Sequence, residues 1–291
     1  MADGRVIGVD LGGTKILAGI LDPDGGLDVV IERPTPSYSQ DELLDALVET
    51  VIELRTPDVV AAGFGVPARV DTRTGFALGA VNTPIHEVPL GDVLGSRLGL
   101  PVGVINDGSA AALAEFVHGA GRGTRDLVLL TLGTGVGGGV IFDGQLYRGW
   151  SEFGHMVIVE DGEPCQGICT GRGHVESYCS GNAADRLARR LLGPAASAHD
   201  LVARRHPALA EIGHHLGAAV GSLVNMFDPD VVVIGGGFGV AAGELLLGPI
   251  RERVLREALA PGGERVQLAV AELGSRAGLI GAGRIAFEAL G

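Results

Sequence analysis

The chain has 291 residues, of which 46% are hydrophobic and 20% charged. This composition is typical of a globular protein with one large or two medium domains, and it excludes intrinsic disorder. The formal net charge is −13 with no basic stripe, which argues against a nucleic-acid-binding protein. No apolar run is long enough to span a membrane, and no secretory leader precedes the first predicted strand. We therefore expect a cytoplasmic protein without membrane association.

The first part of the chain alternates short apolar runs with amphipathic stretches. Strands are predicted over 5–9, 16–21, 27–32, 59–64 and 102–105, and helices over 40–55 and 107–116. The first two strands form a predicted hairpin around a glycine-rich turn. Either Asn106 or Asp107 is expected to cap the second helix.

The pattern then repeats after about residue 120. A strand is predicted over 127–132, a glycine loop over 133–139 and a strand over 140–142; later elements are helices at 181–192, 197–204, 207–226, 241–258 and 277–289 and strands at 231–234 and 266–271. Strand, glycine turn, strand and helices occur in the same order in both halves. The sequence therefore predicts an α/β protein built from two similar lobes.

The first glycine-rich turn is Asp10-Leu-Gly-Gly-Thr-Lys15. It lacks the spacing of a Walker loop. Its glycines allow backbone N–H groups to approach phosphate oxygens, and Lys15 is the only lysine in the chain. The predicted phosphate-binding residues of this turn are Gly12, Gly13, Thr14 and Lys15, with Asp10 placed to hold a hydrated Mg²⁺. An ordinary hairpin turn remains the alternative for this motif alone.

A second glycine loop strengthens that interpretation. Gly133, Thr134 and Gly135 follow a predicted strand in the second half, as the first loop does in the first half. A cleft between two similar lobes can hold a nucleotide by its phosphates from both sides. Gly236 and Gly237, in a third glycine run between a strand and a helix, are candidates for the adenosine or α-phosphate region, although such joints are also common packing devices.

A cluster of sulfur and imidazole side chains follows. His155, Cys165, Cys169 and His174 match a closed tetrahedral zinc site, which orders structure and leaves no open position for chemistry. Two carboxylates, Glu152 and Glu176, lie beside these residues in the sequence. Zinc does not need them when Cys and His suffice, so they are free to accept hydrogen bonds from a polyhydroxyl ligand.

Taken together, these motifs resemble those of the ROK family of repressors, open-reading-frame proteins and sugar kinases. The resemblance spans essentially the whole chain and includes Asp10-Leu-Gly-Gly-Thr-Lys, Asn106-Asp-Gly-Ser-Ala-Ala, Leu132-Gly-Thr-Gly-Val-Gly-Gly-Gly, Glu152-Phe-Gly-His155, the Cys/His cluster and Asn225-Met-Phe-Asp-Pro-Asp. It implies an actin-like ATPase (ribonuclease H-like) fold with two similar lobes around a nucleotide and sugar cleft. It also implies ATP-dependent phosphorylation of a hexose, most often glucose at its 6-hydroxyl, and a homodimer or homotetramer.

The resemblance also assigns roles to residues. It implies that Asp107 is the catalytic base, although a helix-capping role is the alternative, and that the sugar contacts are Asn106, Asp107, Glu152, His155 and Glu176. It implies a structural zinc on the four Cys and His residues named above. The family pattern CxCGxxGCxE is altered here, because three residues separate Cys165 from Cys169 and His174 replaces the third cysteine. The expected small lobe is 1–118 with 278–291, and the large lobe is 119–277.

Other functions stay open at this stage. The substrate can be mannose, fructose or N-acetylmannosamine, and polyphosphate can be the donor. A sugar-sensing regulator is disfavoured, because no basic helix-turn-helix precedes the first strand, and a catalytically silent module is disfavoured by Asp10, Asp107 and both loops. Asn82 is a further candidate sugar contact, with a plain turn as its alternative.

Overall fold

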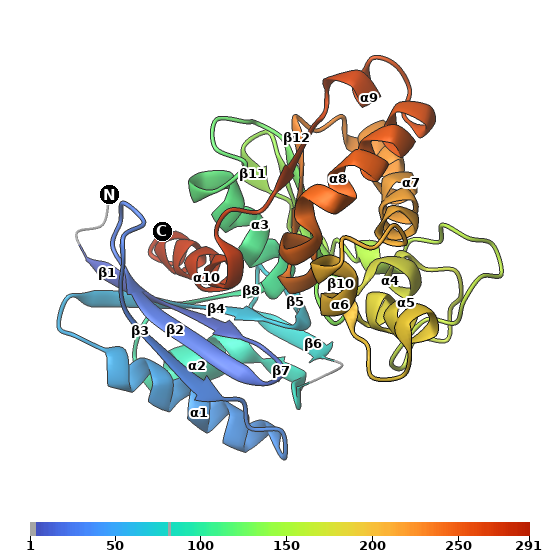
Figure 1. The fold of residues 1–291 in the computed structure, drawn as a ribbon. Coiled ribbons are helices and arrows are strands. Elements are labelled where there is room, and N and C mark those ends of the chain that lie inside the picture. The colour runs from blue at the N-terminus through green and yellow to red at the C-terminus, as the bar shows by residue number, and fades with distance from the viewer. Residues whose placement is uncertain (1–3, 81–82) are drawn as a thin grey trace. The chain divides into compact units, whose positions relative to one another are not determined.

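The computed structural model describes residues 4–80 and 83–291, so Asn82 lies outside the described residues. The chain divides into two compact units (Figure 1). The first comprises Met1–Ala114, Arg148–Trp150 and Arg276–Gly291, and the second comprises Glu115–Tyr147 and Ser151–Ser275. Within the described ranges, no helix is both long and apolar enough to cross a membrane.

The first unit is built on a five-stranded sheet in the order β3-β2-β1-β4-β8. Its strands are β1 (Arg5–Leu11), β2 (Lys15–Leu21), β3 (Leu27–Pro34), β4 (Val59–Val66) and β8 (Val102–Asn106). β1 pairs with β2 antiparallel and with β4 parallel. Helices α1 (Gln40–Leu54) and α2 (Leu90–Leu98) bury their apolar stripes in the core of this unit.

A line of three glycines crosses the sheet of the first unit. Gly8, Gly63 and Gly103 are direct neighbours on the parallel strands β1, β4 and β8. A Cβ at Gly63 would lie only 1.8 Å from the carbonyl oxygen of Ala282 in helix α10 (Ala277–Glu288). The missing side chains therefore let α10 lie directly on the strands. This contact fixes the first turn of α10 near the carboxyl end of β1, where Asp10 is located.

The remaining elements of this unit were not all predicted. Strands β5 (Ala68–Asp71), β6 (Phe76–Ala80) and β7 (His86–Pro89) form a separate antiparallel sheet. Helix α3 (Asp107–His118) follows β8 directly, as expected. The small sheet was missed because each strand has five residues or fewer and only partial burial, which leaves little periodicity to detect. Helix α2 was also missed.

The second unit repeats the arrangement of the first. Its sheet order is β11-β10-β9-β12-β13, again with a central strand paired antiparallel to one neighbour and parallel to the other. The strands are β9 (Leu127–Leu132), β10 (Val136–Phe142), β11 (Gln145–Leu146), β12 (Val231–Gly235) and β13 (Gln267–Val270). The repeat predicted from the sequence is therefore present in the topology.

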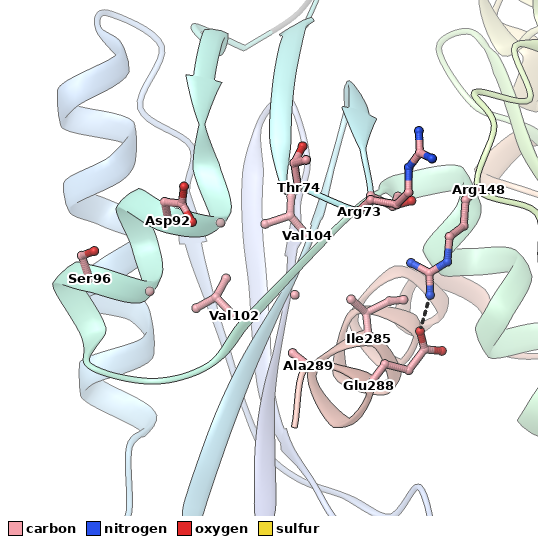
Figure 2. Close-up of a pocket in the computed structure, with 15 residues that line it drawn as sticks. Arg73, Thr74, Asp92, Ser96, Val102, Val104, Arg148, Ile285, Glu288 and Ala289 are labelled. Atoms are coloured by element: carbon pink, nitrogen blue, oxygen red, sulfur yellow. Dashed lines mark hydrogen bonds and ion pairs between the residues drawn. The ribbon is translucent and has the colours of Figure 1, made fainter. Parts of the chain in front are cut away.

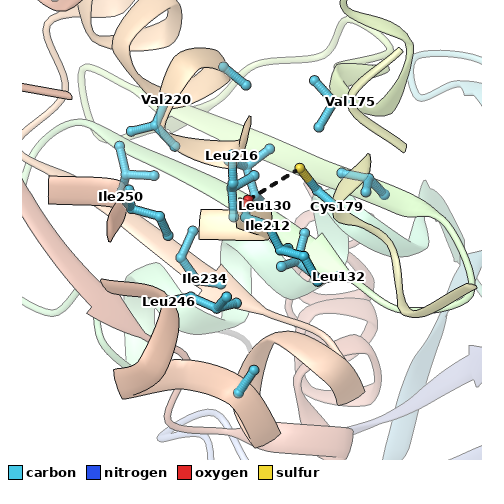
Figure 3. Packing of buried hydrophobic residues seen from close by; sticks show 14 of the residues in the cluster. Leu130, Leu132, Val175, Cys179, Ile212, Leu216, Val220, Ile234, Leu246 and Ile250 are labelled. Atoms are coloured by element: carbon cyan, nitrogen blue, oxygen red, sulfur yellow. Dashed lines mark hydrogen bonds between the residues drawn. The ribbon is translucent and has the colours of Figure 1, made fainter. Parts of the chain in front are cut away.

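The helices of the second unit enclose a large apolar core. They are α4 (Val175–Cys179), α5 (Gly181–Leu192), α6 (Ala198–Ala203), α7 (Leu209–Phe227), α8 (Gly237–Glu257) and α9 (Gly262–Arg265), with short 3-10 turns η1 (Phe153–His155) and η2 (Gly274–Arg276). Figure 3 shows Leu216 of α7 and Ile250 of α8 packed with Leu130 and Ile234 of the sheet. Cys179 lies in this core and is fully buried.

Two boundaries predicted for the second unit were wrong, and one of its helices was not predicted. The second glycine loop ends at Gly135, because residues 136–139 already belong to β10. A side chain at Gly138 would lie 2.2 Å from the carbonyl oxygen of Leu129, so the glycines there serve close strand packing. Helix α8 begins at Gly237 rather than 241, and α4 was not predicted.

Candidate functional site

The first glycine loop joins β1 to β2 and is held by Thr35. The hydroxyl of Thr35 donates to the Gly12 carbonyl at 2.7 Å, and its backbone N–H donates to the Thr14 carbonyl at 3.0 Å. Among the described residues, the structure gives no acceptor to the N–H groups of Gly13 and Thr14. With the Gly12 and Thr14 carbonyls engaged and two N–H groups available, the loop has the donor pattern that anion binding requires.

Lys15 lies at the end of this loop but points to a protein partner. Its Nζ atom is 2.8 Å from a carboxylate oxygen of Glu32, and the side chains of both residues are about half exposed, at 49% and 56%. Exposed ion pairs contribute little free energy. Lys15 can therefore exchange Glu32 for a phosphate at small cost, and its predicted role stays a prediction.

Asp10 and Asp107 influence each other within the first unit. Burial, and to a lesser extent the charge of Asp107, raises the pKa of the Asp10 carboxyl to about 7. The charge of Lys15 acts in the opposite direction. The Asp10 carboxylate also lies against the first turn of α10, since a Cβ at Gly278 would be 2.5 Å from its Cγ atom. A buried carboxyl facing a second carboxylate favours binding of a proton or a cation.

Asn106 and Asp107 both accept hydrogen bonds at the start of α3, and the Asp107 Oδ1 atom accepts one of 2.8 Å from the N–H of Gly108. The Asn106 Oδ1 atom accepts hydrogen bonds from the N–H groups of Gly108 and Ser109 at 2.9 and 3.3 Å, and its Nδ2 atom donates to the Ala68 carbonyl at 3.2 Å. The capping alternative for Asp107 therefore stays open beside its predicted catalytic role. The same contacts engage the Asn106 amide with the protein, so only part of it is available to a sugar.

The second glycine loop, Gly133–Gly135, is held by residues from two other segments. The Gly133 carbonyl accepts a hydrogen bond of 2.7 Å from the N–H of Gly181, and the Gly133 N–H donates to Gly135 at 3.0 Å. The Thr134 carbonyl accepts a hydrogen bond of 3.0 Å from the side chain of Gln166. Within the described chain, the N–H groups of Thr134 and Gly135 are left without an acceptor, which repeats the pattern of the first loop.

The third glycine run lies beside the second loop. Strands β9 and β12 pair in parallel with Thr131 opposite Gly235. Gly236 has a positive φ of 78°, and a side chain there would lie 2.5 Å from the backbone nitrogen of Leu132. Gly237 begins the 21-residue helix α8 and has open space around it. The N-terminus of α8 thus presents backbone N–H groups next to the second loop, where they can bind an anion.

The predicted metal ligands are brought together in the second unit. One donor atom from each of His155, Cys165, Cys169 and His174 lies within 4.8 Å of the others. The two Nδ1 atoms are 3.3 Å apart, the Cys165 Sγ atom is 3.8 Å from His155 Nδ1, and the Cys169 Sγ atom is 3.7 Å from His174 Nδ1. Burial, followed by a hydrogen bond with Cys169, raises the pKa of the Cys165 thiol to about 11.

Two isolated antiparallel bridges fold the chain back on itself and bring the four candidate ligands together. They pair Val157 with His174 and Pro164 with Arg172. His155 ends the turn η1, and His174 directly precedes α4, so both imidazoles are attached to ordered elements. We call residues 165–176, together with His155, the Cys/His loop.

The two predicted sugar carboxylates differ in their surroundings. Glu152 is exposed at the start of η1. Glu176 is partly buried, and its Oε2 atom accepts a hydrogen bond of 2.9 Å from the N–H of Val136. Its other oxygen, Oε1, lies 3.9 Å from the Cys165 sulfur. Glu176 thus joins the Cys/His loop to the second glycine loop, and its predicted sugar contact involves a carboxylate that already has a protein partner.

A cavity of about 570 Å³ lies elsewhere in the first unit (Figure 2). It is bordered by Val102 and Val104 on the edge strand β8 and by the ion pair between Arg148 and Glu288. None of the predicted site residues lines it. The candidate residues of the first unit are therefore its glycine loop, Asp10, Asn106 and Asp107, and this cavity is separate from them.

Two side chains of the site, Thr35 and Gln166, were not identified from the sequence. Each holds a glycine-loop carbonyl from a distant position, 23 and 32 residues away. For Gln166, the only sequence signal was the lengthened segment between Cys165 and Cys169. For Thr35, no motif signalled the contact.

Comparison with known proteins gives a consistent result. The model of the ROK family matches residues 6–289. A glucokinase of Streptomyces coelicolor is 34% identical, with 98% of each chain covered. The crystal structure of a ROK family glucokinase from Streptomyces griseus in complex with glucose and AMPPNP is 35% identical, covers 98% of this chain and 100% of its own, and has a TM-score of 0.85.

A ROK hexokinase from Thermus thermophilus is similar to the same extent. It is 33% identical over 98% of this chain and 99% of its own, with a TM-score of 0.83. The expected α/β fold of the actin-like ATPase class is confirmed by these structural matches.

Proposed function

The chain belongs to the ROK family, and we propose that it is an ATP-dependent glucokinase that phosphorylates the 6-hydroxyl of glucose. The observation that carries the proposal is the likeness, over nearly the whole chain, to a glucokinase whose structure contains glucose and AMPPNP. The arrangement of the side chains is consistent with phosphoryl transfer, which needs positioned phosphates, charge neutralisation and an oriented nucleophile.

We assign the acid–base chemistry to Asp107. It is the first residue of α3, where the helix dipole favours a negative charge, and Asn106 accepts hydrogen bonds at the same helix start. In this role Asp107 accepts the proton of the attacking hydroxyl, a form of assistance that contributes about 10²–10⁴ in rate. Asp10 is suited to hold a hydrated Mg²⁺, because a cation relieves the cost of keeping its buried carboxyl ionised near Asp107.

The two glycine loops are the proposed phosphate-binding elements. Each has at least two carbonyls engaged by protein donors. Among the described residues, each also has two backbone N–H groups without a protein acceptor, namely Gly13 and Thr14 in the first loop and Thr134 and Gly135 in the second. Gly12, Lys15 and Gly133 complete these loops. Gly236 and Gly237, at the N-terminus of α8, are proposed to contact the adenosine or α-phosphate region.

The sugar is proposed to contact Asn106, Glu152, His155 and Glu176. For His155, the Nδ1 atom faces the other metal-ligand candidates, so the second ring nitrogen is available to donate to a hydroxyl. Asn106 and Glu176 each keep one part of the side chain for the protein and one for a ligand.

We propose that the Cys/His loop holds a structural Zn²⁺. Tetrahedral zinc with Zn–N of about 2.05 Å and Zn–S of about 2.3 Å requires N–N separations of about 3.3 Å and N–S separations of about 3.6 Å. The observed 3.3, 3.7 and 3.8 Å match these values closely. A Cys₂His₂ donor set also leaves no position for a reactive water, which supports a structural role.

A coupled assay of ADP release tests the proposed function. Purified protein with Mg-ATP should release ADP in the presence of glucose and far less in its absence. Mannose, fructose and N-acetylmannosamine, tested at the same concentration, decide which hexose is preferred, and polyphosphate in place of ATP tests the donor. Sugar binding without ADP release for all four sugars would favour a sensing protein instead.

We also propose a cellular location and an assembly state for the protein. We expect a cytoplasmic homodimer or homotetramer without nucleic-acid partners, as the family resemblance and the charge of −13 suggest. Light scattering coupled to size-exclusion chromatography measures the oligomeric state directly.

A further inference from the structure

The Cys/His loop is attached to the second glycine loop by two side chains. Gln166 donates through Nε2 to the Thr134 carbonyl at 3.0 Å, and Glu176 accepts from the Val136 N–H at 2.9 Å. These contacts hold both sides of the three-residue loop. Because carbonyl groups only accept and N–H groups only donate, the two contacts fix the loop backbone in one orientation.

Gln166 is itself fixed in place from its other side. Its Oε1 atom accepts a hydrogen bond of 3.0 Å from the Nδ2 atom of Asn182, near the start of α5. An amide that donates at one end and accepts at the other has a single satisfactory orientation. Gln166 also follows directly after Cys165, so the position of its backbone depends on how Cys165 and Cys169 are held.

Within the described part of the chain, the first glycine loop has no attachment of this kind. Its two carbonyls are held by Thr35, the residue that directly follows β3 in the same sheet. The second loop therefore depends on a loop rich in metal-ligand candidates, whereas the first depends on the sheet alone. This asymmetry gives an internal comparison between two loops of one protein.

We propose that Gln166 is a positioning residue for nucleotide binding, and that through Gln166 and Glu176 metal occupancy of the Cys/His loop controls the order of the second glycine loop. The proposal rests on the proposed function, in which that loop binds phosphates. In the metal-bound protein the Cys/His loop holds the carbonyl of Thr134 away from the ligand. The N–H groups of Thr134 and Gly135 then remain directed to the phosphates.

Gln166→Leu is the main test variant, because leucine has a similar size but cannot make either hydrogen bond. Ile168→Ala is the matched control, since Ile168 lies in the same segment and its side chain is 83% exposed. Asn182→Ala removes the second partner of Gln166 and leaves its bond to Thr134. Zinc content by elemental analysis, thermal unfolding, and Kd for Mg-AMPPNP and for glucose by calorimetry are measured on each protein.

We expect Gln166→Leu to keep one zinc per chain and to weaken Mg-AMPPNP binding about three- to tenfold, the range for loss of one neutral hydrogen bond. Its glucose Kd should stay within about twofold of the wild-type value, and Asn182→Ala should give a smaller effect of the same sign. Ile168→Ala should bind like the wild type. Unchanged AMPPNP affinity in a zinc-loaded Gln166→Leu protein would overturn the positioning role.

Hydrogen exchange provides a test that does not depend on nucleotide binding. Removal of zinc from the wild-type protein with a chelator should increase exchange at the amides of residues 133–136 and leave residues 12–14 unchanged. Equal changes in both loops, or in neither, would contradict the metal coupling. If the wild-type protein does not bind AMPPNP at all, the proposed function fails, but the exchange experiment still decides whether metal orders the second loop.

Discussion

The carboxylate of Glu176 accepts a hydrogen bond of 2.9 Å from the backbone N–H of Val136, the first residue after the second glycine loop. Glu176 is also the second residue of α4, a helix that begins directly after His174. One side chain therefore connects a metal-ligand candidate to a phosphate-loop candidate. Only its second oxygen is available for a sugar hydroxyl.

Two substitutions at Glu176 separate these roles. Glu176→Gln keeps an oxygen that accepts from Val136 but loses the charge that strengthens a sugar contact. We expect the KM for the hexose to rise at least about fivefold, since hydrogen bonds to charged groups contribute about 1.5–3 kcal/mol, while the KM for ATP stays nearly unchanged. Glu176→Ala should raise both values. If Glu176 only stabilises the start of α4, both variants would lose some thermal stability and retain the wild-type hexose KM.

Asp107→Asn should keep ligand binding and lose turnover. Asn106 accepts from the N–H groups of Gly108 and Ser109, and an asparagine at position 107 keeps an oxygen that can accept from Gly108 as Asp107 does, so the start of α3 should be preserved. We expect kcat to fall by about 10²–10⁴, the usual contribution of a general base. Calorimetric Kd values for glucose and Mg-AMPPNP should change little. A variant with near-wild-type kcat would remove Asp107 from the mechanism.

The sequence predicted the topology of the candidate site better than its supporting contacts. Asp10, Asp107 and both glycine loops could be located because each lies at the end of an apolar strand, and a strand of that kind is recognisable from local residues alone. Cys165, Cys169 and the two histidines could be grouped because they lie close together in the sequence. These residues are consequently found where strand ends and short turns place them.

The contacts that orient the loops could not be predicted. Thr35 and Gln166 act on carbonyls 23 and 32 residues away, and no local sequence pattern indicates either contact. The length of the second loop was also misjudged, because glycine suggests a turn locally. At Gly138 the tertiary packing against β9 makes glycine necessary within a strand, and only the assembled sheet reveals this.

Cys169→Ser should release the metal and the stability that depends on it. We expect about one zinc per chain in the wild-type protein, and a value well below one in the variant, because the zinc–thiolate bond is lost. A chelator should lower the Tm of the wild type but have little further effect on Cys169→Ser.

Cys179→Ala is the control for that experiment. Cys179 is fully buried in the core and does not belong to the group of clustered donors, and burial holds the pKa of its thiol well above the usual range. This variant should keep its zinc and its response to the chelator. A zinc-free wild-type protein with full activity would contradict both the presence of the metal and its need.

The pH dependence of stability should report on Asp10. Its carboxyl has a pKa of about 7 in the folded protein and about 4 when unfolded, so the folded state binds the proton more tightly. The resulting stabilisation is fully present below about pH 4 and is lost as the pH rises through about 7. Within that window, Asp10 alone lowers the free energy of unfolding by up to about 1.4 kcal/mol per pH unit.

Asp10→Asn isolates this contribution, because the amide has nearly the same shape and does not titrate. Urea unfolding at several pH values from 4 to 8, in EDTA and without nucleotide, should show a shallower decline with rising pH for the variant than for the wild type. Asp24→Asn, at an exposed turn, should follow the wild-type curve. Parallel curves for all three proteins would mean that Asp10 ionises normally in the fold, and that its burial beside Asp107 does not create a demand for a cation.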